Sequence, residues 1–341
     1  MGKGICISGN MAVDLTCHVE RWPNQGELVH ITRKIERSIG GAVCNTIMDI
    51  AKLDPGMHLV ACGFAGHDEQ GDFMLEELGK CKNIDLSAVQ RNGETSISMV
   101  ISNNEDKQRT FLQYAGGNAD FSEKHIDIDR LDVDIFHIGY ILMLKTLDEE
   151  DPEYGTRMAR LLKQVQGKGI KTSVDVISES GNRFRKIVVP ALKYTDYCII
   201  NEIEAAKTTG IRLRNDRGGL LEKNIPEALE ALLDLGVTTW AIIHSPEAGF
   251  GMTADKTFHR QESLNLPPGY IAGTVGAGDA FCAGVLYAAE KNLPIGQALK
   301  IGTCSAAASL SCSNASDGLR PIGDVLKLYE KYGVKQEGEG V

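Results

Sequence analysis

The sequence lacks several features that would place the protein in well-known structural classes. It contains no apolar run approaching the ~20 residues that a bilayer-spanning helix needs, and its first residues lack the long apolar stretch of a secretory signal peptide. None of its nine cysteines belongs to a Cys-x-x-Cys pair, so neither a zinc ribbon nor a thioredoxin-like site is indicated. We therefore expect a cytoplasmic protein with reduced thiols and no membrane partner.

An excess of basic residues is also absent. The chain of 341 residues has 36 Lys and Arg against 46 Asp and Glu, which gives a net charge of −10. Such a surface repels polyanions on average, so nucleic-acid binding is not expected. A ligand that carries phosphate would have to be held by local dipoles, a metal ion or a few basic residues.

What the sequence does contain is an alternation of short apolar runs with helical segments. The runs predicted as buried strands are residues 5–8, 59–62, 135–138, 172–176, 197–200 and 240–243. Helices are predicted over residues 42–53, 73–80, 154–165, 226–235 and 279–290. This order predicts an α/β fold of three layers, in which helices flank both faces of a mostly parallel sheet. We expect one domain over residues 1–334 and a polar tail over 335–341.

Two stretches break this alternation. Residues 26–38 contain no helix signal, and two strand-like segments, 96–102 and 109–114, surround the polar turn 103–106. Such segments are typical of antiparallel strands with one face in water. We predict a small inserted sheet, a lid formed within about 15–38 and 95–114, that covers an active site. A purely structural hairpin is the alternative, and the exposed face of the sheet would also allow a homodimer.

A glycine-rich turn carries the strongest chemical signal. Residues 273–281 read Gly-Thr-Val-Gly-Ala-Gly-Asp-Ala-Phe and lead into an alanine-rich helix. The first N–H groups of a helix have no partner and lie at the positive end of the helix dipole, so a phosphate can bind there. Asp279 adds a carboxylate at the same helix start, either as an N-cap or as a general base. An anion site beside a carboxylate indicates phosphoryl transfer to a hydroxyl group.

This segment resembles the C-terminal motif of the ribokinase-like (PfkB) carbohydrate kinase family, and four other segments resemble further motifs of that family in the same order. They are Ser-Gly-Asn-Met-Ala-Val-Asp at 8–14, Gly-Gly-Ala-Val-Cys-Asn at 40–45, Gly-Phe-Ala-Gly-His-Asp-Glu-Gln-Gly at 63–71 and Asn-Glu-Ile-Glu at 201–204. The resemblance extends from about residue 4 to about residue 330. Five ordered motifs are far more specific than any one of them.

The resemblance implies a substrate site near the N-terminal motifs. Asp14 would accept hydrogen bonds from two sugar hydroxyls, Gly40 and Gly41 would let the backbone approach the ligand, and Asn45 would offer both a donor and an acceptor. The structural alternatives are a turn-forming Asp14 and a helix-start turn with Asn45 facing solvent.

At the C-terminal motif, the resemblance implies a catalytic role for four consecutive residues. The backbone of Gly276, Ala277 and Gly278 would stabilise charge on the transferring phosphoryl group, and Asp279 would take the proton of the acceptor hydroxyl.

The implied nucleotide-binding residues are Asn201, Gly249, Gly276 and Gly278, with ATP as the phosphoryl donor. Glu204 would hold Mg²⁺ through water, since Mg²⁺ keeps several waters and takes few protein ligands. The alternative is that Glu204 simply lies in the first turn of a helix.

The sequence departs from the family pattern at two points. Gly273 stands where the family usually has an Asp associated with a monovalent-cation site, which puts potassium activation in doubt. Residues 244–249 keep only the final glycine, Gly249, of a Gly-rich nucleotide loop. Arg109, in the predicted lid, either meets a substrate acid group or phosphate or is a solvated charge on an edge strand.

These observations predict an ATP-dependent sugar kinase that phosphorylates a primary hydroxyl of a small-molecule sugar. A nucleoside kinase of the same family is the first alternative. A nucleoside site would need apolar or aromatic residues to stack the base, and the first 45 residues contain only Trp22 among large aromatics. A non-catalytic sugar sensor is the second alternative, and the presence of Asp279, Asn201 and Glu204 argues against it.

Overall fold

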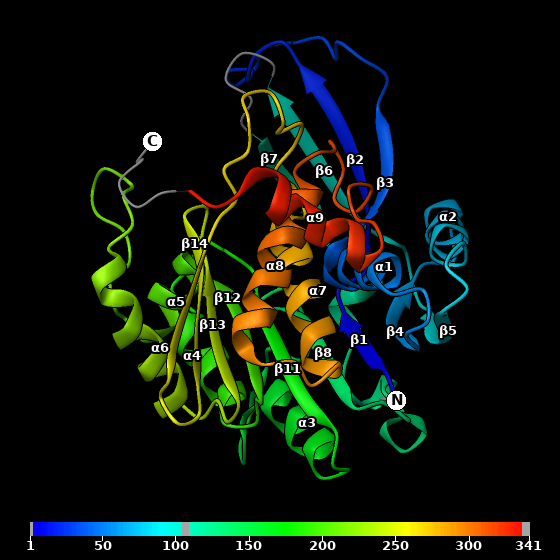
Figure 1. Ribbon diagram of the computed structural model, residues 1–341. Helices are drawn as coiled ribbons and strands as arrows, with labels where there is room; N and C mark the ends of the chain where they lie inside the picture. Colours follow the sequence, from blue (N-terminus) through cyan, green and yellow to red (C-terminus); the bar gives the residue numbers. More distant parts are fainter. Residues whose placement is uncertain (1–2, 104–108, 336–341) are drawn as a thin grey trace.

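Two sheets organise the computed structural model, which describes residues 3–103 and 109–335 (Figure 1). The larger sheet contains β1 (Ile5–Gly9), β4 (Leu59–Ala65), β5 (Ile84–Arg91), β8 (Ile135–Ile141), β11 (Lys171–Val176), β12 (Tyr197–Asn201), β13 (Trp240–His244), β14 (Ala248–Thr253) and β15 (Phe258–Glu262). Their order is β15-β14-β13-β12-β11-β8-β1-β4-β5. Every pair from β13 to β5 is parallel, whereas β14 and β15 are antiparallel additions at one edge. The predicted mostly parallel sheet is confirmed.

Helices cover both faces of this sheet. One apolar core lies between the sheet and α3 (Arg157–Gln166), α4 (Phe184–Leu192), α5 (Glu202–Thr209) and α6 (Ile225–Asp234). On the opposite face a second core packs against α1 (Gly41–Leu53), α2 (Glu69–Leu78), α7 (Ala277–Glu290) and α8 (Ile295–Ser309). The last helix, α9 (Ile322–Tyr332), packs on α8. No helix in the described part of the chain is long and apolar enough to cross a membrane.

The continuous apolar runs explain why the central strands pair in parallel. All residues of β1 and β4 are buried, so neither strand has a face for water. A sheet that is covered on both sides needs such runs rather than alternating patterns. The two apolar cores therefore lie on either side of β1 and β4, whose continuous apolar runs made them easy to predict as buried strands.

The lid is a four-stranded sheet that stands above the carboxyl end of β1 at the top of Figure 1. Its strands are β2 (Ala12–Val19), β3 (Glu36–Gly40), β6 (Ser96–Asn103) and β7 (Arg109–Tyr114), in the order β3-β2-β6-β7. The chain leaves β1 at Gly9 for the lid and returns from β3 directly into α1. The lid is thus inserted and tied to the main sheet at that point. The homodimer through this sheet stays a prediction.

Several predicted details of the lid are wrong. Its first two strands, β2 and β3, begin at Ala12 and end at Gly40, beyond both ends of the predicted range 15–38, and most of residues 20–35 are irregular. The sheet is not purely antiparallel, because β2 and β6 run parallel from Ala12↔Ser96 to Val19↔Asn103. Only β2–β3 and β6–β7 are antiparallel. Most of the predicted turn 103–106 lies outside the described residues.

Two predicted helices start at other residues than expected, because of a local strand pairing and a local helix cap. The predicted helix 154–165 begins only at Arg157, because residues 155–156 form β10 (Gly155–Thr156), which pairs with β9 (Glu150–Asp151). The predicted helix 73–80 begins earlier, at Glu69, because the Asp68 side chain accepts the N–H of Gly71. In the predicted polar tail, the N–H of Lys335 still donates to the Ser263 carbonyl, and residues 336–341 lie outside the described part.

Candidate active site

The residues singled out by the sequence gather where the parallel strands end. Gly9 and Asn201 close β1 and β12, and the start of α7 lies at the same edge of the sheet. In open α/β sheets this edge, beyond the carboxyl ends of the strands, is where ligands bind. The lid sheet covers it from above.

Asp279 lies in the first turn of α7 but is not its N-cap. The N-cap is Gly276, which has no side chain. The Asp279 carboxylate instead accepts a hydrogen bond from Asn45 Nδ2 at 2.9 Å and bonds from the Tyr140 hydroxyl at 3.1 Å to each oxygen. The capping alternative is therefore wrong, and the side chain is aimed at residues far away in the sequence.

Burial sets the acidity of this carboxyl. It raises the pKa of Asp279 to about 6, against the stabilising bonds from Asn45 and Tyr140. Asp279 is thus ionised at neutral pH while its pKa stands close to that range, as a general base requires.

The turn before Asp279 can be made only by glycine. Gly276 has φ +79, and a Cβ there would lie 2.5 Å from the Ala315 Cβ. This left-handed residue directs the chain into α7, so the N–H groups of Ala277, Gly278 and Asp279 are the first of the helix and have no partner within it. They lie beside the Asp279 carboxylate, and the first N–H groups of a helix are where anions bind in proteins.

Three cavities meet at this point. The lid cavity, about 770 Å³, is lined by Asp14, Gly41, Asn45 and Arg109 and reaches Gly276 and Asp279. The helix cavity, about 550 Å³, lies on the other side of α7 and is lined by Asn201, Gly249, Ala277 and Gly278. Between them, the junction cavity of about 180 Å³ is lined by Glu204, Gly276, Gly278 and Asp279, among others. The structure thus brings the predicted acceptor residues and the predicted nucleotide residues to opposite sides of one turn.

Asp14 is a buried carboxylate on β2. Burial, and then the negative charge of Asp279, raise its pKa to about 7. Gly40 is required beside it, because a Cβ at Gly40 would lie 2.4 Å from the Asp14 carboxylate. Gly41 has φ +80, and a Cβ there would meet Asn10 Oδ1 at 2.4 Å. The two glycines therefore let the backbone pass close to the Asp14 and Asn10 side chains, and Gly41 itself lines the lid cavity.

Arg109 and Gly273 turn out to be neighbours. A Cβ on Gly273 would lie 3.0 Å from Arg109 Nη2, so the missing side chain leaves room for the guanidinium. Burial lowers the pKa of Arg109, opposed by the negative charge of Glu36. Since Arg109 is half-buried and lines the lid cavity, it is not simply a solvated edge charge. Nothing in the sequence pattern indicated that Arg109 and Gly273 are in contact.

Asn201 and Glu204 form a capping box at the start of α5. The N–H of Asn201 donates to Glu204 Oε2 at 2.9 Å, and its Nδ2 donates to Oε1 at 2.7 Å. The Ser178 hydroxyl donates to Oε1 at 2.8 Å. Burial raises the pKa of Glu204 to about 7 despite these bonds. Glu204 thus does lie in the first turn of a helix, as the structural alternative held.

The same contacts also bear on Mg²⁺. Glu204 Oε1 already accepts two hydrogen bonds and Oε2 accepts one, and the residue lines the junction cavity. This donor fits Mg²⁺ held through water better than a directly bound ion.

Tyr140 is a site residue that the sequence analysis did not predict. It lies in β8 with φ +67, a strained conformation for a tyrosine. Its N–H donates to Asp175 Oδ1 at 2.5 Å, which fixes the strained residue. Burial and the charge of Asp279 raise the pKa of Tyr140 well above its usual range, so its phenol stays a donor. A tyrosine directly after Gly139 at a strand end was the only signal in the sequence.

The site defines a phosphotransferase, with an anion cradle and a carboxylate between two cavities. Residues 3–321 match the model of the pfkB family carbohydrate kinases, and the chain belongs to this family. As a member it is an ATP-dependent carbohydrate or nucleoside kinase, so a non-catalytic sensor is not supported.

The relatives span different acceptors. The chain is 22% identical to a nucleoside kinase of Methanocaldococcus jannaschii, over 97% of this chain and 98% of that protein. It is 26% identical to a 5-dehydro-2-deoxygluconokinase of Clostridium perfringens, over 89% of this chain and 88% of that protein. The structure of Arabidopsis thaliana ribokinase complexed with ribose and ATP matches with a TM-score of 0.77 at 21% identity, covering 96% of this chain and 99% of that one. The ribokinase-like fold is thereby confirmed.

Proposed function

We propose that the protein transfers the γ-phosphoryl group of ATP to a primary hydroxyl of a sugar held in the lid cavity. The observation that carries this proposal is the position of Asp279, at the junction of two cavities and beside the first N–H groups of α7. ATP would bind in the helix cavity with its terminal phosphate at Gly276–Gly278. The acceptor hydroxyl would then lie between Asp279 and that phosphate.

Each residue then has a separate task. Asp279 takes the hydroxyl proton, and the N–H groups of Ala277 and Gly278 stabilise charge on the transferring group. Asp14, whose pKa of about 7 leaves it partly ionised at neutral pH, accepts hydrogen bonds from the sugar. Mg²⁺ would neutralise charge on the nucleotide phosphates, with Glu204 orienting its waters. Most of the rate gain comes from positioning and electrostatics.

Tyr140 holds the base in its ionised form. Replacing it with phenylalanine removes a donor to the Asp279 carboxylate and favours the protonated acid, so the pKa of Asp279 rises. Because the ionised form is active, the acid limb of kcat/KM should move upward by about one pH unit. The measurement is a pH profile of Tyr140→Phe against the wild type. Tyr154→Phe, at the β9–β10 turn, is the matched control with an unmoved limb, and an unmoved limb in Tyr140→Phe would contradict this role.

A nucleoside is the second candidate acceptor, and one observation favours it. The lid cavity is lined by the apolar side chains of Phe111, Leu142, Met143 and Ile177 in addition to its polar groups. Phe111 lies on the lid strand β7, and a ring there can stack on a base. Phe111 therefore offers the aromatic side chain for base stacking that a nucleoside site would need.

A coupled ADP-release screen over pentoses, hexoses, keto-deoxy acids and nucleosides separates the two acceptors. If the substrate is a plain sugar, Phe111→Ala should leave kcat/KM nearly unchanged. If it is a nucleoside, loss of a stacking contact of ~1–3 kcal/mol should lower kcat/KM by ~5–150-fold. Leu112→Ala, on the same strand but absent from the lining of the lid cavity, is the control. Turnover with none of these acceptors would contradict the proposed function.

A further inference from the structure

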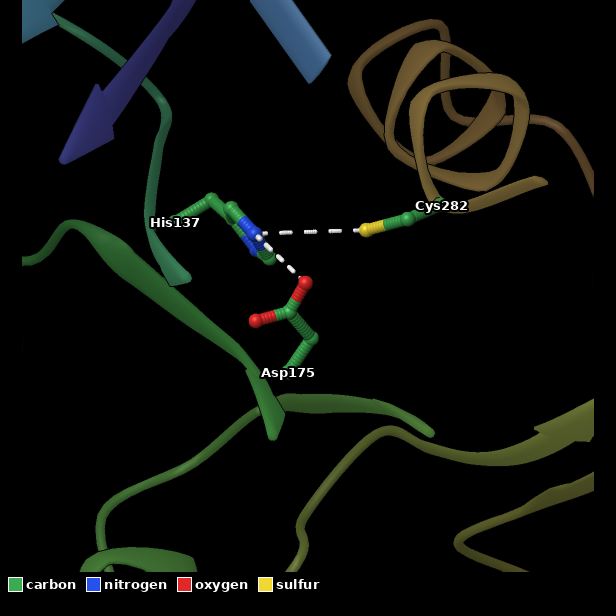
Figure 2. Close-up of side chains that lie close together, drawn as sticks. All are labelled: His137, Asp175 and Cys282. Atoms are coloured by element: carbon green, nitrogen blue, oxygen red, sulfur yellow. Dashed lines mark hydrogen bonds and ion pairs between the residues drawn. The ribbon is translucent and has the colours of Figure 1, made fainter. Parts of the chain in front are cut away.

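Three buried side chains with metal-binding atoms converge beneath the junction cavity. Figure 2 shows His137 from β8, Asp175 from β11 and Cys282 from α7 pointing toward one another. His137 Nε2 lies 3.9 Å from Asp175 Oδ2 and 4.0 Å from Cys282 Sγ. All three ligand atoms lie within 4.8 Å of one another, the one such group of histidine, cysteine and carboxylate found among the described residues.

The three groups do not satisfy each other. A separation of 3.9 Å between His137 and Asp175 is too long for a hydrogen bond, and the contact to the thiol is at the limit even for sulfur. All three residues are less than a tenth exposed, and of the three only Asp175 and Cys282 line the junction cavity.

Each side chain is also held by a partner outside the group. His137 Nδ1 pairs with the Ser173 hydroxyl at 3.0 Å, and Asp175 Oδ1 accepts the Tyr140 N–H at 2.5 Å. These bonds leave Nε2 and Oδ2 as the atoms that face each other. Outer hydrogen bonds of this kind orient the ligands of metal sites.

The spacing is close to that of a tetrahedral ion. Zn–N and Zn–S bonds of about 2.0 and 2.3 Å at a tetrahedral angle place the two ligand atoms roughly 3.5 Å apart. The 4.0 Å contact would have to contract by about half an ångström, and the pair of ligand atoms farthest apart, at no more than 4.8 Å, by up to about 1.3 Å. Asp175 and Cys282 line the junction cavity, which supplies an entry path and a fourth, open position.

We propose that His137, Asp175 and Cys282 bind a borderline-soft divalent cation such as Zn²⁺, with the fourth ligand position open to the junction cavity. The mixed N, O and S donor set suits Zn²⁺ and Co²⁺ rather than Mg²⁺, which prefers oxygen. Metal binding by these three residues does not depend on the proposed function.

The binding test uses the full-length, metal-free protein titrated with Co²⁺. A thiolate–cobalt charge-transfer absorption should appear, saturate at one equivalent, and disappear when Zn²⁺ is added. It should be lost in Cys282→Ala and kept in Cys304→Ala, a matched variant of another buried cysteine, on α8. Thermal unfolding verifies that both variants fold.

A second variant keeps all three ligands. Ser173→Ala removes only the partner of His137 Nδ1 and should weaken Co²⁺ binding by ~10–100-fold. Absence of the absorption in the wild type, its persistence in Cys282→Ala, or equal affinity in Ser173→Ala would each overturn the proposal. Since none of these readouts needs turnover, a wrong proposed function would leave them unaffected.

Discussion

Replacement of Asp279 by asparagine is expected to lower kcat by ~10²–10⁴-fold with the best acceptor, because the amide cannot take the hydroxyl proton. The change is nearly isosteric, and the amide oxygen can still accept hydrogen bonds from Asn45 and Tyr140. The KM for the acceptor should therefore change far less than kcat. Asp216→Asn, a carboxylate in an exposed turn, is the control. Near-native turnover in Asp279→Asn would refute the assignment of the base.

The same variant should be more stable than the wild type at neutral pH. The folded protein binds the Asp279 proton more tightly than the unfolded chain does, since burial raises its pKa from 3.8 to about 6. Its favourable contribution to stability is therefore complete below the unfolded pKa and is lost as the pH rises through about 6. We expect the Tm advantage of Asp279→Asn to be largest near pH 8 and to shrink toward pH 4. A Tm gain independent of pH would show that its cause is not this ionisation.

The parts of the structure fixed by local patterns were predictable. Strands such as β4 and β12 are short apolar runs whose residues are nearly all buried, and the glycine turn before α7 has its own conformational requirement. Boundaries that depend on pairing were not predictable. The start of α3 is set by a two-residue strand pair, and the parallel pairing of β2 with β6 joins segments more than 80 residues apart.

The features of the site that could not be predicted from the sequence also have physical causes. Whether Asp279 caps its helix or faces the cavity is decided by Asn45, 234 positions away in the sequence. Tyr140 takes part because a bond to Asp175 stabilises a backbone conformation that tyrosine rarely adopts. The contact between Arg109 and Gly273 needs the lid to fold over the main sheet. Such long-range contacts leave no mark in a single sequence, whereas the glycines and carboxylates themselves do.

Replacing Gly276 with alanine should be nearly as damaging to turnover as removing the base. The new Cβ would lie 2.5 Å from the Ala315 Cβ and 2.8 Å from its carbonyl oxygen, so the turn must move. The movement takes the first N–H groups of α7 away from the transferring phosphoryl group. Loss of one such donor typically costs ~10²–10³-fold in kcat.

Strain and collision can be separated by a matched variant. Gly218 has φ +82, close to that of Gly276, but a Cβ there would meet nothing within 4 Å. Gly218→Ala therefore introduces similar backbone strain without the collision, and it should leave kcat unchanged while lowering the Tm. Because Asp14 and Asn45 are carried by β2 and α1 rather than by this turn, the KM for the acceptor should change less than kcat in Gly276→Ala. Equal kcat in Gly276→Ala and the wild type would show that the anion cradle does not contribute to the transfer step.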